Sequence, residues 1–198
     1  SGFLNYITQS PHTGVAVAAG NEGNLRRHYL GNITQPYYTD FELNVDEKDS
    51  FFPMEIWVSS PYRLNLEVTS PNGEIIRNIY PRLNECRRFS FIFNTTTLWV
   101  NNIVSESDTG DQIIIVRFEN TAKGIWRFRT YSIDEEPTLF HVWLPSGDII
   151  FHDTHFIDSN PDTTLTSPGN AESPLVVTNL NETSGSISLS SSRSYTRY

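Results

Sequence analysis

The middle of this chain is built from short stretches in which apolar and polar residues alternate. A period of two places every second side chain on the same face of an extended strand, so Leu64, Leu66 and Val68 share one face. This pattern predicts half-buried strands. The stretches that show it are RLNLEVT (63–69), RFSFIFN (88–94, with Phe89, Phe91 and Phe93 on one face), QIIIVRFE (112–119), IWRFRTYS (125–132) and LFHVWL (139–144).

Turn-forming sequences separate these stretches. They are SPNG (70–73), SDTG (107–110), NTAKG (120–124) and PSGD (145–148). No helical segment of useful length interrupts the series. We therefore predict a mainly β chain whose centre is an antiparallel β-sandwich of the jelly-roll kind, with about eight to ten strands.

The two ends of the chain have a different texture. Residues 3–7 (FLNYI) predict the end of a helix, and Val15–Ala19 form a small apolar run of the kind found in parallel strands buried on both faces. A similar run, LVVTNL, follows at 175–180. The Ser-rich sequence after it predicts, on composition alone, a flexible chain end. We expect three regions, 1–24, 25–157 and 158–198, with the sandwich inserted between two strands of a parallel sheet.

Composition excludes several classes of protein. Hydrophobic residues make up 37% and aromatic residues 13% of the chain, which is enough for a packed core. Fourteen Lys and Arg against 23 Asp and Glu give a net charge of −9, which argues against nucleic acid and anionic membrane partners. The single cysteine, Cys86, excludes an internal disulfide and a cysteine metal cluster. No apolar run reaches the roughly 18 residues that a membrane span needs. The chain begins with Ser1, and we expect it to be a segment of a longer protein.

Three segments carry a resemblance to subtilisin-like serine proteases. GVAVAAGNEGN (14–24) resembles the segment with the oxyanion-hole asparagine, and TLTSPGNAESPLVVTNL (164–180) resembles the one that follows it. SISLSSSRSYTRY (186–198) is similar to the Ser-Ser-Arg-Gly-x-Thr stretch upstream of the catalytic serine, with Ser194 where the family has Gly. The intervening sandwich resembles the branch of subtilases with an inserted jelly roll, which includes proteases of bacterial spore germination.

The resemblance implies roles for four residues. Asn21 takes the role of the oxyanion-hole donor, and Ala18, Ala19 and Gly20 line the primary specificity pocket. From the residues alone, Asn21 is a turn residue after Gly20, and the small residues serve close strand packing. The resemblance further implies a peptide or protein substrate, the remainder of the catalytic domain as a partner, no cofactor, and a bacterial, secreted, cell-surface or spore-associated protein.

The catalytic Asp, His and Ser of that family have no matching motif in this sequence, and none of the five histidines stands in the context of the triad base. We therefore expect the triad to lie outside this chain and the chain alone to be inactive. The sandwich is expected to have a structural or regulatory role. Two alternatives remain open: a stand-alone jelly-roll binding module for glycan or protein ligands, and part of a catalytically dead pseudoprotease.

Three further groups of residues have side chains that could bind a ligand. His152, Asp153 and His155 are close enough in sequence to bind a metal, but a solvated strand end is the favoured interpretation. The carboxylates of VDEKDS offer oxygen ligands for a structural calcium ion without the repeated spacing of a known loop; they are Asp46, Glu47 and Asp49. Four tryptophans offer a sugar platform, but each stands in an apolar run and is expected in the core; they are Trp57, Trp99, Trp126 and Trp143.

Overall fold

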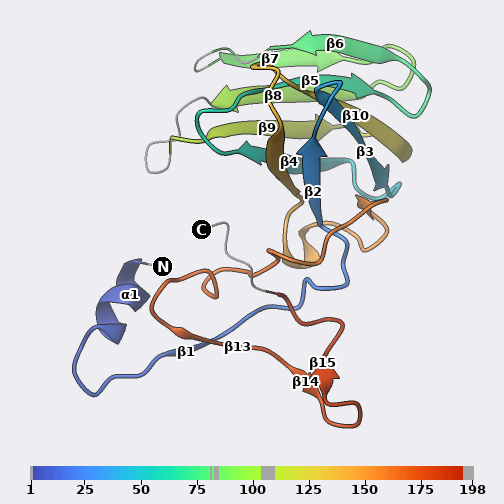
Figure 1. Ribbon diagram of the computed structural model, residues 1–198. Helices are drawn as coiled ribbons and strands as arrows, with labels where there is room; N and C mark the ends of the chain where they lie inside the picture. Colours follow the sequence, from blue (N-terminus) through green and yellow to red (C-terminus); the bar gives the residue numbers. More distant parts are fainter. Residues whose placement is uncertain (1, 81, 83–84, 104–109, 194–198) are drawn as a thin grey trace. The chain divides into compact units, whose positions relative to one another are not determined.

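A computed structural model describes residues 2–80, 82, 85–103 and 110–193 (Figure 1). Its elements are, in chain order, α1 (Gly2–Thr8), β1 (Ala16–Ala18), β2 (His28–Ile33), β3 (Tyr38–Val45), β4 (Phe51–Val58), β5 (Leu64–Thr69), β6 (Ile75–Ile79), β7 (Glu85–Ser90), β8 (Thr97–Ile103), β9 (Gln112–Glu119), β10 (Gly124–Ser132), β11 (Thr138–Trp143), the 3₁₀ turn η1 (Gly147–Ile149), β12 (His155–Phe156), β13 (Leu175–Val177), β14 (Leu180–Asn181) and β15 (Ser186–Ile187). The chain is mainly β, as predicted. No helix of the described residues has the length and apolar composition of a membrane span.

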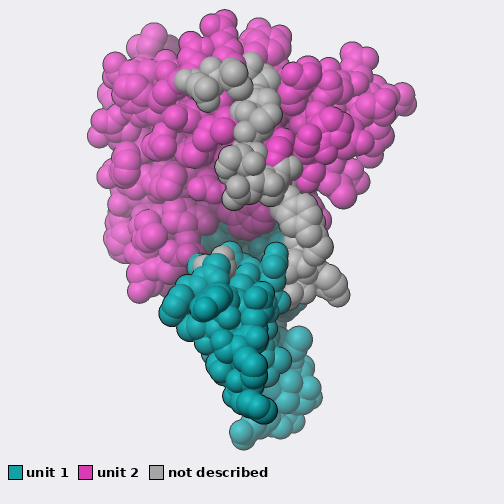
Figure 2. All heavy atoms as spheres, turned by 90° about the vertical axis from the view of Figure 1, so that its left-hand side faces the viewer, with its two compact units in different colours: residues 1–28, 160–198 teal, residues 29–159 magenta. Residues whose placement is uncertain are grey.

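The chain divides into two compact units, which Figure 2 colours separately. Unit 1 comprises residues 1–28 and 160–198, and unit 2 comprises residues 29–159. The sequence placed the boundaries at 24/25 and 157/158, a few residues from these positions. Unit 1 is therefore formed by two segments that are distant in the sequence, and unit 2 is one continuous segment.

Unit 2 is a sandwich of two sheets. The five-stranded sheet has the order β12-β3-β10-β5-β6 and the six-stranded sheet the order β2-β11-β4-β9-β8-β7. Neighbouring strands in these sheets run antiparallel in the pairs β3–β10, β5–β10, β3–β12, β5–β6, β4–β11, β4–β9, β7–β8 and β8–β9. Strands β3 and β4 lie in different sheets although they are consecutive, and so do β9 and β10. This arrangement confirms the predicted antiparallel sandwich.

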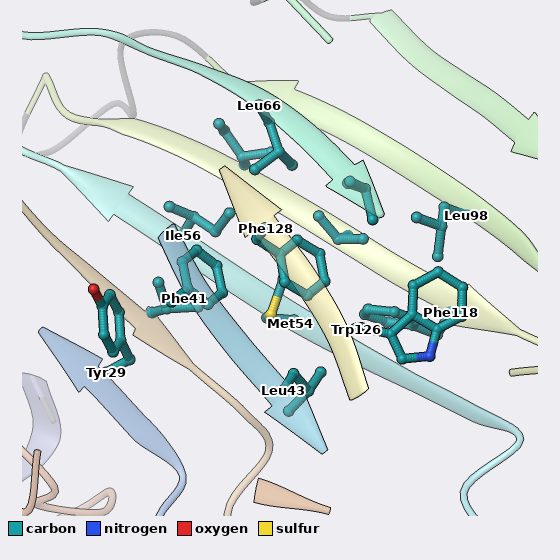
Figure 3. Close-up of a cluster of buried hydrophobic side chains, with 14 of the residues drawn as sticks. Tyr29, Phe41, Leu43, Met54, Ile56, Leu66, Leu98, Phe118, Trp126 and Phe128 are labelled. Atoms are coloured by element: carbon teal, nitrogen blue, oxygen red, sulfur yellow. The ribbon is translucent and has the colours of Figure 1, made fainter. Parts of the chain in front are cut away.

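The core of unit 2 lies between the sheets and is rich in aromatic rings (Figure 3). Phe41 stacks on Phe128 with ring centroids 4.9 Å apart, and Phe52 stacks on Phe118 at 4.5 Å. Trp126 meets the Phe118 ring edge-on. Each such ring removes a large apolar area from water and gains from its orientation, so this cluster is the main source of stability in the unit.

The structure departs from the predicted strand at 88–94. Strand β7 ends at Ser90, Phe91 is buried, and Phe93 is exposed. The backbone N–H groups of Ile92 and Phe93 donate to the Glu74 carboxylate, and Phe91 N–H donates to the Thr96 carbonyl at 2.8 Å. The chain therefore turns here, and the alternation of phenylalanines does not continue along one face.

The prediction that all four tryptophans belong to the core is wrong for three of them. Trp126 is fully buried, but Trp57 and Trp143 are only partly buried, and Trp99 is exposed. Trp57 alternates with the buried Ile56 and Val58 and thus lies on the outer face of the six-stranded sheet. An apolar run gives no indication of which face its members occupy, because both neighbours of each residue are apolar as well.

Unit 1 contains helix α1 and two small sheets. Strand β1 pairs in parallel with β13, so that Ala16 is opposite Leu175 and Ala18 opposite Val177. The helix expected from FLNYI and the strand expected from the small apolar run are both present. Burial of β1 on both faces is wrong for the described residues, because Ala16 and Ala18 are exposed and β13 is the one strand described beside it.

The described part of the Ser-rich sequence, residues 184–193, is folded rather than the flexible end that composition predicted. Strand β15 pairs antiparallel with β14, and Ser191 and Ser192 are buried. Composition fails here because serine is small enough to pack against backbone and can satisfy its hydroxyl by a hydrogen bond. Ser194, where the resemblance breaks, lies outside the described residues.

Candidate functional site

The segment with the candidate site residues begins where β1 ends. Ala19 continues the ladder beyond the strand, since its N–H donates to the carbonyl of Val177 at 3.0 Å. The Ala19 carbonyl accepts the Thr166 N–H at 3.1 Å. Ala19 is thereby fixed between β13 and the turn that starts at residue 166, and the chain then leaves the sheet through Gly20 and Asn21.

Gly20 is required by its surroundings. Its φ is +104°, in the region that favours glycine, and a Cβ atom there would lie 2.4 Å from Oγ1 of Thr166. Gly169 packs closely against the end of β1, since a Cβ atom on Gly169 would lie 2.9 Å from the Ala18 carbonyl oxygen. The small residues of both segments let two pieces of backbone approach closely.

A cleft of about 440 Å³ opens beside this segment. It is lined by Ala16, Val17, Ala18, Ala19, Gly20, Asn21, Val177, Thr178, Asn179 and Ser191. The structure thus brings the four predicted site residues together on one concave surface. Six of the ten lining residues are Ala, Val or Gly, and such small residues leave room for a side chain of a bound molecule.

Asn21 is the polar residue at the end of this strand. It is exposed, and it makes no hydrogen bond with any residue that the structure describes. An amide with two free N–H groups at a cleft can donate to an oxyanion. The role of Asn21 and of the pocket residues stays a prediction from the resemblance.

Three polar residues that follow Asn21, namely Glu22, Arg27 and His28, are buried. Glu22 and Arg27 form an ion pair with a distance of 3.4 Å between Oε2 and Nη1. His28 is buried as well, and its Nδ1 lies 3.0 Å from the Asn160 carbonyl oxygen. Burial lowers the pKa of His28, and the Asn160 and Asp162 backbone contacts and the Asp162 charge oppose this effect in part.

Sequence reasoning missed six of the ten residues that line the cleft, among them Asn179 and Ser191. Asn179 N–H donates to Ser191 Oγ at 3.3 Å, which joins the end of β13 to the Ser-rich segment. The available signal was the Ser-Ser-Arg match of the resemblance, which the composition of the segment overrode.

The three carboxylates of VDEKDS, at Asp46, Glu47 and Asp49, bond to other groups of the protein. Oδ2 of Asp49 accepts the Thr154 hydroxyl, and its carboxylate accepts the Phe151 N–H at 3.0 Å. Asp46 accepts the Lys48 N–H, and Glu47 pairs with Lys123 at 3.0 Å. The three carboxylates therefore stabilise the loops around them through these bonds. Among the described residues, no group of three or more His, Cys, Asp and Glu side chains is placed to hold a metal ion. His152, Asp153 and His155 therefore do not form such a group.

A second hollow, of about 520 Å³, lies on the outer face of the five-stranded sheet of unit 2. Its charged residues form cross-strand pairs: Arg129 with Asp40, Arg127 with Glu42 and Arg77 with Glu67. Since the charges on this face neutralise one another, it has no excess charge with which to attract a charged ligand.

Comparison with solved structures finds a fold match to the CspB protease of Clostridium perfringens. The match has a TM-score of 0.86 and 22% sequence identity, and it covers 99% of this chain and 41% of that protease chain. This chain thus has the fold of a part of the protease and spans about two fifths of its length. No family model matches this sequence, and no curated protein sequence does either.

Proposed function

We propose that this chain is part of a subtilisin-like serine endopeptidase to which it supplies the oxyanion donor and one wall of the substrate site. The nucleophile and its base come from residues elsewhere in the protein. When that nucleophile attacks a peptide carbonyl, the side-chain amide of Asn21 donates to the oxygen that becomes negatively charged. Ala18, Ala19 and Gly20 form a wall against which the substrate side chain before the cleaved bond lies.

One observation supports this proposal above the others. Asn21 follows β1, which pairs in parallel with β13, and it lines a cleft with a side-chain amide that no described residue bonds. A turn residue with a purely structural role normally uses its side chain to bond the local backbone. Asn21 does not, and its amide is therefore available to a bound molecule.

The exposed apolar residues of unit 1 support the proposed partner, which is the remainder of the catalytic domain. Leu175, Leu180 and Leu189 are all exposed, and none of them lines the cleft. Exposed apolar residues gathered on a small unit are typical of a surface that another part of the protein covers. The substrate is proposed to be a peptide or protein, and the protein to be bacterial and secreted, cell-surface or spore-associated.

Unit 2 is proposed to support the protease without taking part in bond cleavage. Its core is complete within residues 29–159, so it can act as a rigid body attached at two points of the catalytic domain. Replacement of residues 29–159 by a short linker in the complete protein should lower the thermal stability or impair maturation more than it lowers kcat. Loss of turnover with normal folding and maturation would contradict this role.

The proposed reaction is tested on the complete protein with a labelled peptide library and an active-site serine probe such as a fluorophosphonate. Asn21→Ala should lower kcat by about 10²–10³-fold with a small change of KM, because the donor acts on the transition state. Asn24→Ala is the matched control, since Asn24 is also exposed but does not line the cleft. Failure of the wild-type protein to react with the probe would indicate a pseudoprotease. An Asn21→Ala variant with full kcat would refute the assigned role.

A further inference from the structure

The Asn21 side chain forms no hydrogen bond with any of the residues described, but both neighbours of Asn21 are held by one distant segment. Ser192 N–H donates to the Gly20 carbonyl at 2.9 Å. The Ser192 hydroxyl oxygen accepts the Glu22 N–H at 2.9 Å, across 170 residues of sequence. Ser192 therefore bonds the residue before Asn21 and the residue after it.

The packing around these bonds leaves no space for the turn to shift. A Cβ atom on Gly23 would lie 2.2 Å from the Ser191 carbonyl oxygen, and one on Gly20 would lie 3.0 Å from Ser192 Oγ. Gly23 N–H also donates to the Ser190 carbonyl at 3.1 Å. Ser192 itself is completely buried.

The holding segment is in turn fixed to the rest of unit 1. Arg193 N–H donates to Thr164 Oγ1 at 3.0 Å, and Thr164 N–H donates to the Arg193 carbonyl at 3.1 Å. Thr164 lies two residues before Thr166, which bonds Ala19 on the other side of the turn. The turn around Asn21 is thus held from both sides by two segments that also bond each other.

We infer that Ser192 is a positioning residue for the Asn21 amide, acting through its bonds to Gly20 and Glu22. An oxyanion donor is effective only if its direction is set before the reaction, because reorientation during the reaction costs part of the stabilisation. The turn residues fix the Asn21 backbone, and Ser192 fixes the turn residues. The catalytic part of this inference depends on the proposed function, whereas the conformational part does not.

The catalytic part is tested in the complete protein with Ser192→Ala, which removes the hydroxyl acceptor of Glu22 N–H. We expect kcat to fall about tenfold with KM unchanged within twofold. The double variant Asn21→Ala/Ser192→Ala should be no slower than Asn21→Ala alone, because Ser192 acts through Asn21. Ser186→Ala is the control, since Ser186 is exposed in β15 and its hydroxyl bonds Ser184. Additive losses in the double variant would overturn the inference.

The conformational part is tested by amide hydrogen exchange, which needs no peptidase activity. In the wild-type protein the buried Glu22 N–H should exchange at least tenfold more slowly than an exposed amide, and Ser192→Ala should remove this protection. A Glu22 amide that is unprotected in the wild type, or equally protected in the variant, would refute the role of Ser192 whatever the protein cleaves. A protected amide in a protein without peptidase activity would refute the proposed function and retain the positioning role.

Discussion

The two units of this molecule differ in which apolar residues they bury. Unit 2 has a core of large apolar side chains between two sheets, with Trp126, Phe118 and Phe128 at or near zero exposure, although others such as Phe93 are exposed. Unit 1 has small apolar residues against backbone and leaves its larger ones, such as Leu175 and Leu189, exposed. Unit 2 therefore has a hydrophobic core of its own, whereas the described residues of unit 1 contribute no side chain to that core. The candidate site lies in unit 1, where close approach of backbone segments, rather than core volume, determines the shape.

The largest expected effect comes from the core of unit 2. Phe118→Ala removes a ring that stacks on Phe52 and meets Trp126, and should lower the free energy of unfolding by about 3–5 kcal/mol. Leu189→Ala in unit 1 is the matched comparison and should change it by no more than about 0.5 kcal/mol. Chemical denaturation followed by tryptophan fluorescence measures both. Equal losses for the two variants would mean that unit 1 is stabilised in the same way as unit 2.

A smaller effect is expected at the site turn of unit 1. Gly20→Ala places a Cβ atom 2.4 Å from Thr166 Oγ1 at a positive φ, and should cost about 1–3 kcal/mol. The loss should be local, so the Ala19 amide should exchange faster while the amides of β9 and β10 keep their protection. Gly14→Ala is the control, because a Cβ atom there meets no atom within 4 Å. Unchanged exchange at Ala19 would show that the turn does not depend on glycine.

The smallest effect is a dependence of unit 1 on pH. The folded pKa of His28 is below the unfolded value of 6.5, so folding favours the neutral ring. The unfolded chain takes up a proton more readily than the folded chain. The contribution of neutral His28 to the free energy of unfolding is therefore fully present above pH 6.5, and it is lost as the pH falls from there through the folded pKa. The nearby Asp162 carboxylate opposes this loss. Denaturation midpoints between pH 8 and pH 5 should fall less in His28→Gln than in the wild type, and His12→Gln should behave as the wild type because His12 is exposed. Parallel pH profiles for His28→Gln and the wild type would contradict the assignment.

The sandwich was predictable from the sequence where strand and turn signals agreed. The stretches at 112–119 and 125–132 correspond to β9 and β10 within one residue. The prediction failed at Phe93, where a turn interrupts the pattern, and at Trp99, where an apolar run does not say which side of the sheet a residue occupies. Short-range patterns report a local period, and the assignment of faces depends on strands that are distant in sequence.

The site was predictable in part and by a different kind of evidence. The small residues and Asn21 were found through a family resemblance, and the structure places all four on one cleft. The buried Ser191 and Ser192 were hidden in a sequence whose composition is typical of a flexible tail. Nothing in a serine-rich stretch distinguishes a hydroxyl that solvates a loop from one that accepts a distant backbone N–H.

The sequence by itself determined which stretches are strands in unit 2, because side chains that alternate in polarity can bury one face only in an extended chain. It also indicated that the small residues Ala18, Ala19 and Gly20 serve close packing. Only the tertiary structure decided that β13 is the partner of β1 and that Ser192 holds the turn around Asn21. The physical reason is that these contacts are made largely by backbone N–H and C=O groups, which every residue except proline has in the same form, so their partners follow from which segments the fold brings together.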